Sequence, residues 1–213
     1  MELKGKSIVF LGDSITAGVG ASCIENRYSD VLVRIAELGE NYNYGISGTR
    51  IARQFDRNEY HDVNSFCERF DKMKDDVDIV FVFGGTNDYG HGDAPFGNFE
   101  DRTMDTYCGA LHYLMRGLIE KYPAAQIVFM TPLHREGDSN PSIFNQLPLK
   151  DYVDKIKETA EYYSSPVLDL YGCGGICPDI PQQKELYVPD GLHPNDAGAE
   201  KIAEKIKVFL KNL

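Results

Sequence analysis

The sequence predicts one three-layer α/β domain over residues 1–213, built on a parallel sheet of five strands. Short apolar runs that suit buried strands alternate with helical patterns at the spacing of βαβ units. A polar turn containing glycine follows most of these runs, and no repeat or linker interrupts them. Crossovers between parallel strands are right-handed, and five strands favour the flavodoxin-like order 2-1-3-4-5 with helices on both faces.

The elements are predicted from apolar runs and from apolar residues at helical spacing. The run from Ile79 to Phe83 has the strongest buried-strand pattern, because every residue in it is apolar. The predicted strands cover residues 8–11, 41–44, 78–83, 126–130 and 166–170. The predicted helices cover residues 29–38, 64–74, 101–122, 150–163 and 195–210. Residues 18–20 are expected to form a glycine-rich loop, and residues 131–147 an irregular segment of the kind that can wall a pocket.

Composition excludes several classes of protein. The chain has 22 Lys and Arg against 33 Asp and Glu, so its net charge of −11 disfavours nucleic acid and anionic polymers as partners. A hydrophobic fraction of 42% and a charged fraction of 26% are ordinary for a globular protein. No apolar run approaches the roughly 18 residues of a membrane-spanning helix.

The five cysteines do not predict a disulfide framework, because they are odd in number and scattered. Cys173 and Cys177 have no second Cys or His pair nearby, so free thiols are expected there rather than a zinc site. The amino terminus lacks the long apolar core of a signal peptide. The expected location is therefore the cytoplasm.

The first chemical candidate is Ser14, which follows the first predicted strand in the segment Gly12-Asp13-Ser14-Ile15. Ligands of open α/β sheets bind at the carboxyl ends of the strands, and Gly12 allows the backbone to turn there. Ser14 can therefore act as a nucleophile. The alternative is an ordinary strand-to-helix turn in which Asp13 or Ser14 caps the helix.

Three further turns complete a set of groups suited to acyl transfer, which needs a base, a residue that orients it and donors for an oxyanion. Asp190 lies three residues before His193, so one turn can direct both side chains inward. Gly48 can offer a backbone N–H and Asn87 a side-chain amide. Taken singly, the Asp190 and Asn87 segments are also compatible with a turn before a helix and with a capping turn.

The other histidines are weaker candidates. His61 has no motif around it, and His112 lies in a helical pattern, where a surface or packing role is expected. His91 and His134 lie in loops at the presumed active edge. Either of them, like Asp13, can contact substrate. The alternative is that both are loop histidines exposed to solvent.

Together these segments resemble the SGNH (GDSL-like) hydrolase family over nearly the whole chain. The family's blocks are similar to Gly12-Asp13-Ser14-Ile15, Gly45-Ile46-Ser47-Gly48, Gly85-Thr86-Asn87-Asp88 and Asp190-Gly191-Leu192-His193. The resemblance implies Ser14 as nucleophile, His193 as base and Asp190 as its orienting acid. It also implies an oxyanion hole of Ser14 N–H, Gly48 N–H and the Asn87 amide, although Gly45 competes with Gly48. The Gly-x-Ser-x-Gly elbow of α/β-hydrolases is absent.

The resemblance implies a serine esterase that needs no metal or cofactor and acts on a small-molecule ester. The absence of tryptophan and of a long apolar lid helix favours short acyl chains, such as those of O-acetylated carbohydrates. Alternatives on the same site are a lysophospholipase, a thioesterase or an acyltransferase. A protein of another class, a catalytically silent carbohydrate-binding module, stays open as well.

Overall fold

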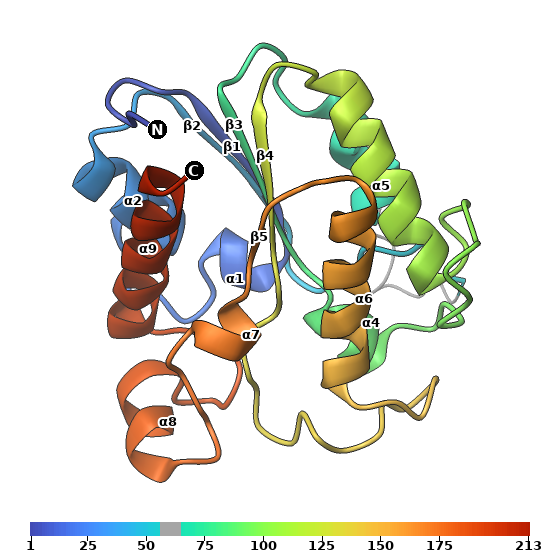
Figure 1. Cartoon of the computed structure of the whole chain (residues 1–213). Coiled ribbons are helices and arrows are strands. Elements are labelled where there is room, and N and C mark those ends of the chain that lie inside the picture. The colour runs from blue at the N-terminus through green and yellow to red at the C-terminus, as the bar shows by residue number, and fades with distance from the viewer. Residues whose placement is uncertain (56–64) are drawn as a thin grey trace.

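The computed structural model describes residues 1–55 and 65–213 and contains a five-stranded sheet of order β2-β1-β3-β4-β5 (Figure 1). All four strand pairs are parallel, so the predicted fold class and strand order are confirmed. The strands are β1 Ile8–Gly12, β2 Asn41–Gly45, β3 Ile79–Phe83, β4 Gln126–Met130 and β5 Val167–Leu168.

Helices cover both faces of the sheet (Figure 1). One layer consists of α2 (Tyr28–Ala36) and α9 (Asp196–Lys211), and the other contains α5 (Tyr107–Lys121) and α6 (Leu149–Tyr162). Successive strand residues point to opposite faces, so each strand contributes to both cores.

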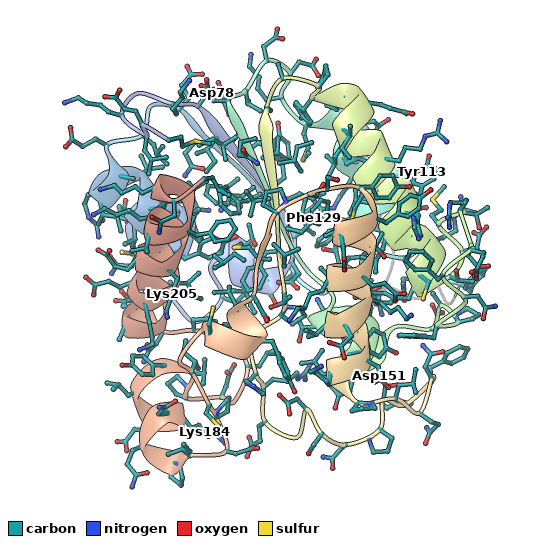
Figure 2. All side chains as sticks on the ribbon, in the orientation of Figure 1. Asp78, Tyr113, Phe129, Asp151, Lys184 and Lys205 are labelled. Atoms are coloured by element: carbon teal, nitrogen blue, oxygen red, sulfur yellow. The ribbon has the colours of Figure 1, made fainter. Side chains whose placement is uncertain are left out.

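The two cores divide the side chains of β1 and β3 in alternation. Ile8 and Phe10 pack in the core beneath α2 and α9, whereas Val9 and Leu11 pack in the core beneath α5 and α6. Figure 2 labels Phe129 of β4 in the interior and Tyr113 on the outer side of α5. Burial on both faces explains why β1, β3 and β4 are read from the sequence as nearly continuous apolar runs.

Several short helices lie outside the predicted set, because four to seven residues are too few to show a helical period. They are α1 Ser14–Ala17, α4 Thr86–His91, α7 Leu170–Cys173 and α8 Pro181–Tyr187, with the 3₁₀ turn η1 Ile24–Asn26. By contrast, α3 Phe66–Arg69 and the 3₁₀ turn η2 Phe70–Lys72 lie inside the predicted helix 64–74. The helix predicted over 64–74 is thus two short pieces in its described part. Among the described helices, none is both long and apolar enough to cross a membrane.

Two other boundaries differ from the sequence prediction for reasons of capping. The helix predicted to begin at residue 101 begins at Tyr107, because Thr106 caps it by accepting from Gly109 N at 3.1 Å. The Thr106 hydroxyl also donates to Asp101, which is thereby held in the preceding turn. The fifth strand ends at Leu168 because Asp169 caps α7.

The register of the sheet sets the level at which the turns after the strands begin. Gly12 at the end of β1 pairs with Gly45 of β2 and with Phe83 of β3. The turns that follow these strands therefore emerge side by side, and α1 and α4 both lie toward the lower end of the sheet in Figure 1. This edge receives the candidate residues of the first three motifs.

Candidate active site

Ser14, His193 and Asp190 form a continuous chain of hydrogen bonds at this edge. The Ser14 Oγ lies 2.9 Å from His193 Nε2, and the His193 Nδ1 lies 2.7 Å from Asp190 Oδ2. Ser14 is the first residue of α1 and is 6% exposed. The structure therefore joins residues that are 179 positions apart in the sequence.

Asp190 is fixed by the turn that it begins. Its Oδ1 accepts from the backbone N–H of Leu192 at 2.9 Å and of His193 at 2.7 Å. Partial burial would raise the pKa of this carboxyl, but its hydrogen bonds with the His193 ring and with these backbone groups together hold the pKa below the ordinary value. Asp190 is thus ionised at neutral pH and accepts the Nδ1–H of His193, which leaves Nε2 as an acceptor for the Ser14 hydroxyl.

The loop after α1 holds the His193 segment against Ser14. Gly20 has a φ of 96°, and a Cβ atom there would lie 2.5 Å from the Pro194 carbonyl oxygen and 3.1 Å from the His193 Cβ. Farther along the loop, Ser22 donates from its backbone N–H and its hydroxyl to Asp196 at 2.8 and 2.6 Å. The predicted glycine-rich loop therefore packs directly on the candidate base.

The structure separates the roles of Gly45 and Gly48. Gly45 N–H donates to Asn43 Oδ1, and a Cβ at Gly45 would lie 2.2 Å from Ala17 N, so this glycine is needed for packing against α1. Gly48 has a φ of 76° and lines the same cleft as Ser14. Within residues 1–55 and 65–213, no backbone acceptor is bonded to the Gly48 N–H. Of the two glycines, only Gly48 lines the cleft.

Asn87 lies in the first turn of α4 beside Ser14 and is 4% exposed. One N–H of its side-chain amide donates to Thr49 O at 3.0 Å, and its Oδ1 lies 3.1 Å from His91 Nε2. An amide has two N–H donors. The second remains for a group in the cleft.

These side chains open onto a cleft of about 290 Å³. Its lining comprises Ser14, Val19, Ser47, Gly48, Asn87, His91, Arg135, Leu192 and His193. The volume is at the small end of ligand pockets. A larger hollow of about 760 Å³ lies beside α8 and the start of α9, and Ser14, His193 and Asp190 are not among the residues that line it.

Sequence reasoning did not single out Val19, Ser47, Leu192 or Arg135, and of these only Arg135 carries a charge. Its Nη1 makes long hydrogen bonds to Thr86 O and Oγ1, at 3.2 and 3.3 Å, and its guanidinium lies 5.6 Å from the Tyr89 ring centroid. Burial lowers its pKa. A signal was present in the sequence, because Arg135 is the one Lys or Arg in the stretch 131–147.

The other residues that the sequence suggested for the site differ in whether they line the cleft. Asp13 is 1% exposed and its carboxylate accepts a hydrogen bond from Ile15 N, so it stabilises the turn after β1 from its buried side. His134 pairs with Asp138 at 2.6 Å and is not among the cleft-lining residues, whereas His91 is. His112 is a buried packing residue among aromatic rings. His61 lies outside the described residues.

Asp13 makes the stability of the protein depend on pH. Burial raises its pKa to about 7, against about 3.9 in an unfolded chain. The folded state therefore binds this proton more tightly, and the free energy of unfolding falls as pH rises through that interval. We expect the melting temperature of the wild type to fall relative to that of Asp13→Asn between pH 5 and 8, as measured by scanning fluorimetry. The Asn side chain still accepts from Ile15 N but cannot ionise.

Asp78 provides the control for this measurement. Hydrogen bonds from Lys6 and Ser7 lower its pKa to about 2, so it is ionised in both states above pH 5. The offset between the wild type and Asp78→Asn should therefore stay constant over the same range. If the melting temperatures of the wild type and Asp13→Asn change by the same amount between pH 5 and 8, Asp13 does not titrate in that range.

Comparison with known proteins relates this chain to a family and to several solved structures. Residues 10–201 match the GDSL-like Lipase/Acylhydrolase family. A solved protein from Lactobacillus plantarum is 34% identical, with a TM-score of 0.85 and coverage of 99% of this chain and 98% of that one. Among curated proteins, none matches.

Two more distant structures share the fold. One, from Bacteroides ovatus ATCC 8483 and assigned as a GDSL-like lipase, is 22% identical, with a TM-score of 0.66 and full coverage (100%) of both chains. The other, from Agrobacterium tumefaciens str. C58 and assigned as an arylesterase, is 15% identical, with a TM-score of 0.69 and coverage of 97% and 99%.

Proposed function

This chain belongs to the GDSL-like lipase/acylhydrolase family of ester hydrolases, and from that membership we propose that Ser14 hydrolyses short-acyl esters, O-acetylated carbohydrates in particular. The observation that carries the proposal is the hydrogen-bonded chain from Ser14 through His193 to Asp190 at the wall of a small cleft. The whole chain, residues 1–213, acts as one domain, and its free cysteines suit the cytoplasm.

In the first half of the reaction, the Ser14 Oγ attacks the ester carbonyl while His193 Nε2 accepts its proton. Asp190 keeps the ring in the required tautomer and stabilises the imidazolium that forms. The carbonyl oxygen becomes an oxyanion and accepts hydrogen bonds from Ser14 N–H, Gly48 N–H and the second N–H of Asn87. The imidazolium then gives its proton to the alcohol leaving group, and the acyl group stays on Ser14.

In the second half, water replaces the alcohol. His193 Nε2 takes a proton from this water, whose oxygen attacks the acyl carbon and restores the oxyanion in the same hole. Collapse of this intermediate breaks the bond to Ser14 Oγ, which recovers its proton from His193. The products are a carboxylic acid and the unmodified serine.

The size of the cleft and the donors of Arg135 support a short acyl group on a hydroxylated alcohol. About 290 Å³ accommodates an acetyl group and part of a sugar, whereas a long acyl chain would extend beyond it. Among the described residues, no carboxylate forms an ion pair with Arg135, and its bonds to Thr86 are long. Sugar hydroxyls can accept hydrogen bonds from the remaining guanidinium donors, which relieves the cost of a half-buried charge.

We therefore expect kcat/KM to be highest for acetyl esters and to fall as the acyl chain lengthens beyond butyryl. Arg135→Met should lower kcat/KM for an acetylated sugar by about tenfold or more, the effect of losing a hydrogen bond to a charged donor. It should change kcat/KM for p-nitrophenyl acetate, which has no hydroxyl, by less than about twofold. Initial rates with a panel of p-nitrophenyl esters and acetylated xylose or glucosamine measure both effects.

The matched control is Arg116→Met, since Arg116 is an exposed arginine on α5 that pairs with Glu120. It should leave both substrates unaffected. Preference for palmitoyl esters would contradict the substrate class. Failure to hydrolyse any ester, together with failure to react with a fluorophosphonate, would favour a binding module over an enzyme.

A further inference from the structure

The Asn87 amide is held at both ends by protein groups. Its Nδ2 donates to Thr49 O at 3.0 Å, and its Oδ1 faces His91 Nε2 at 3.1 Å. His91 is in turn held by Arg50, whose Nη2 lies 2.7 Å from His91 Nδ1 and donates to the His91 carbonyl oxygen at 3.0 Å. A continuous path of hydrogen bonds therefore runs from Arg50 to Thr49.

The chemistry of the two ends determines the direction of every bond between them. Arg50 can only donate, so His91 Nδ1 must be the acceptor and the ring proton must lie on Nε2. His91 Nε2–H then donates to Asn87 Oδ1. At the other end Thr49 offers a carbonyl oxygen, which can only accept, so the amide must direct its NH₂ group toward it.

We propose that Arg50 and His91 are positioning residues that fix the orientation of the Asn87 amide so that its second N–H faces the oxyanion. The proposal rests on the function proposed above, in which Asn87 donates to that oxyanion. An amide rotated by 180° would place its Oδ1 against the Thr49 carbonyl and its NH₂ against His91 Nε2–H. The rotated amide would also present an acceptor to the developing negative charge, where catalysis needs a donor.

Arg50 is itself held rigidly. It is 2% exposed, and its carbonyl oxygen accepts from Phe66 N at 2.9 Å. The next two residues, Ile51 and Ala52, donate their backbone N–H groups to the Asp88 carboxylate at 2.9 and 3.0 Å. Since Asp88 directly follows Asn87, the segment that carries Arg50 is anchored beside the amide that it orients.

Two substitutions of His91 test the Nε2–H donor separately from the rest of the imidazole ring. In His91→Gln, the side-chain NH₂ can occupy the place of Nε2–H and donate to Asn87 Oδ1. In His91→Asn, the shorter side chain can still accept from Arg50 but cannot reach Asn87. We expect His91→Asn to lower kcat for acetyl ester hydrolysis by about tenfold with KM nearly unchanged, and His91→Gln to stay within about threefold of the wild type.

A double-mutant cycle with Asn87→Ala tests whether His91 acts through Asn87. Asn87→Ala alone should lower kcat by roughly 10²- to 10³-fold, the cost of one oxyanion donor. In that background His91→Asn should change kcat by less than about twofold. The same tenfold loss in both backgrounds, or a rise in KM, would assign His91 to direct substrate contact and overturn the proposal. If His91→Asn leaves the wild-type kcat unchanged, or if His91→Gln is as damaging as His91→Asn, the proposal is also wrong.

The ring tautomer provides a second readout on the unsubstituted protein. ¹⁵N NMR of the histidine ring should show His91 protonated at Nε2 and unprotonated at Nδ1 near neutral pH. A proton on Nδ1 would rule out the Arg50 bond and the relay with it. If Asn87→Ala keeps full activity while the tautomer is as expected, the oxyanion role of Asn87 fails although the hydrogen-bond path exists. In that case the proposal falls with the oxyanion role, and hydrolysis by Ser14 does not.

Discussion

Replacement of Ser14 by alanine should lower kcat for ester hydrolysis by roughly 10⁴- to 10⁶-fold, since members of a catalytic triad act as a unit. The methyl group of alanine has no lone pair to attack the carbonyl, so neither half of the proposed reaction can proceed through an acyl-enzyme. The melting temperature should stay close to that of the wild type, because the Ser14 hydroxyl bonds to His193 and to no core residue of the described chain. Stopped assays with acetyl esters and scanning fluorimetry measure the two quantities.

Ser165→Ala is the control, since Ser165 lies between α6 and β5, away from the cleft. It should keep wild-type activity. A fluorophosphonate should add one phosphonyl group to the wild type and to Ser165→Ala, and none to Ser14→Ala, as read by intact-protein mass spectrometry. More than a tenth of wild-type turnover in Ser14→Ala would exclude Ser14 as the nucleophile.

Asp190→Asn should lower kcat by roughly 10³- to 10⁴-fold, although the substitution hardly changes the shape of the side chain. The Asn Oδ1 can still accept from Leu192 and His193 backbone N–H groups, so the turn survives. Its NH₂ group, however, would then face His193 Nδ1 and force the ring proton onto Nε2. The tautomer that accepts a proton from Ser14 is lost.

The kinetic signature distinguishes this effect from unfolding. KM and the melting temperature should change little in Asp190→Asn, whereas kcat falls. Asp179→Asn, a substitution of an exposed aspartate in the loop before α8, should leave kcat within about twofold of the wild type. Retention of more than a tenth of wild-type kcat in Asp190→Asn would mean that another group orients His193.

Most of the strands could be predicted because they are buried on both faces of the sheet. Strands such as β1 and β3 supply side chains to two cores, which makes them apolar without interruption. The short helices carried no such signal. The positions of α1 and α4 depend on the strands that they follow. With four and six residues respectively, neither helix is long enough to show in the sequence which of its faces is buried.

Site residues could be predicted where they lie in one local motif. They could not be predicted where their positions depend on contacts between segments far apart in the sequence. Asp190 and His193 share one turn, so three residues of spacing were sufficient. Arg50 lies in no such motif, and for Arg135 the sequence offered only its place as the one Lys or Arg in 131–147, because the positions of both depend on the packing of α4 and of the loop after β4. The packing of Gly20 on the His193 segment likewise joins segments far apart in the chain, which no local pattern records.

The distance along the chain between Ser14 and His193 has a consequence for biosynthesis. Ser14 is translated before His193 and before α9, whose Ile202 and Ile206 pack in the same core as Val31 and Leu32 of α2. A nascent chain on the ribosome therefore carries the serine without its partner until α9 has left the exit tunnel and docked. Reactivity of Ser14 toward a fluorophosphonate would then report the completion of folding during translation.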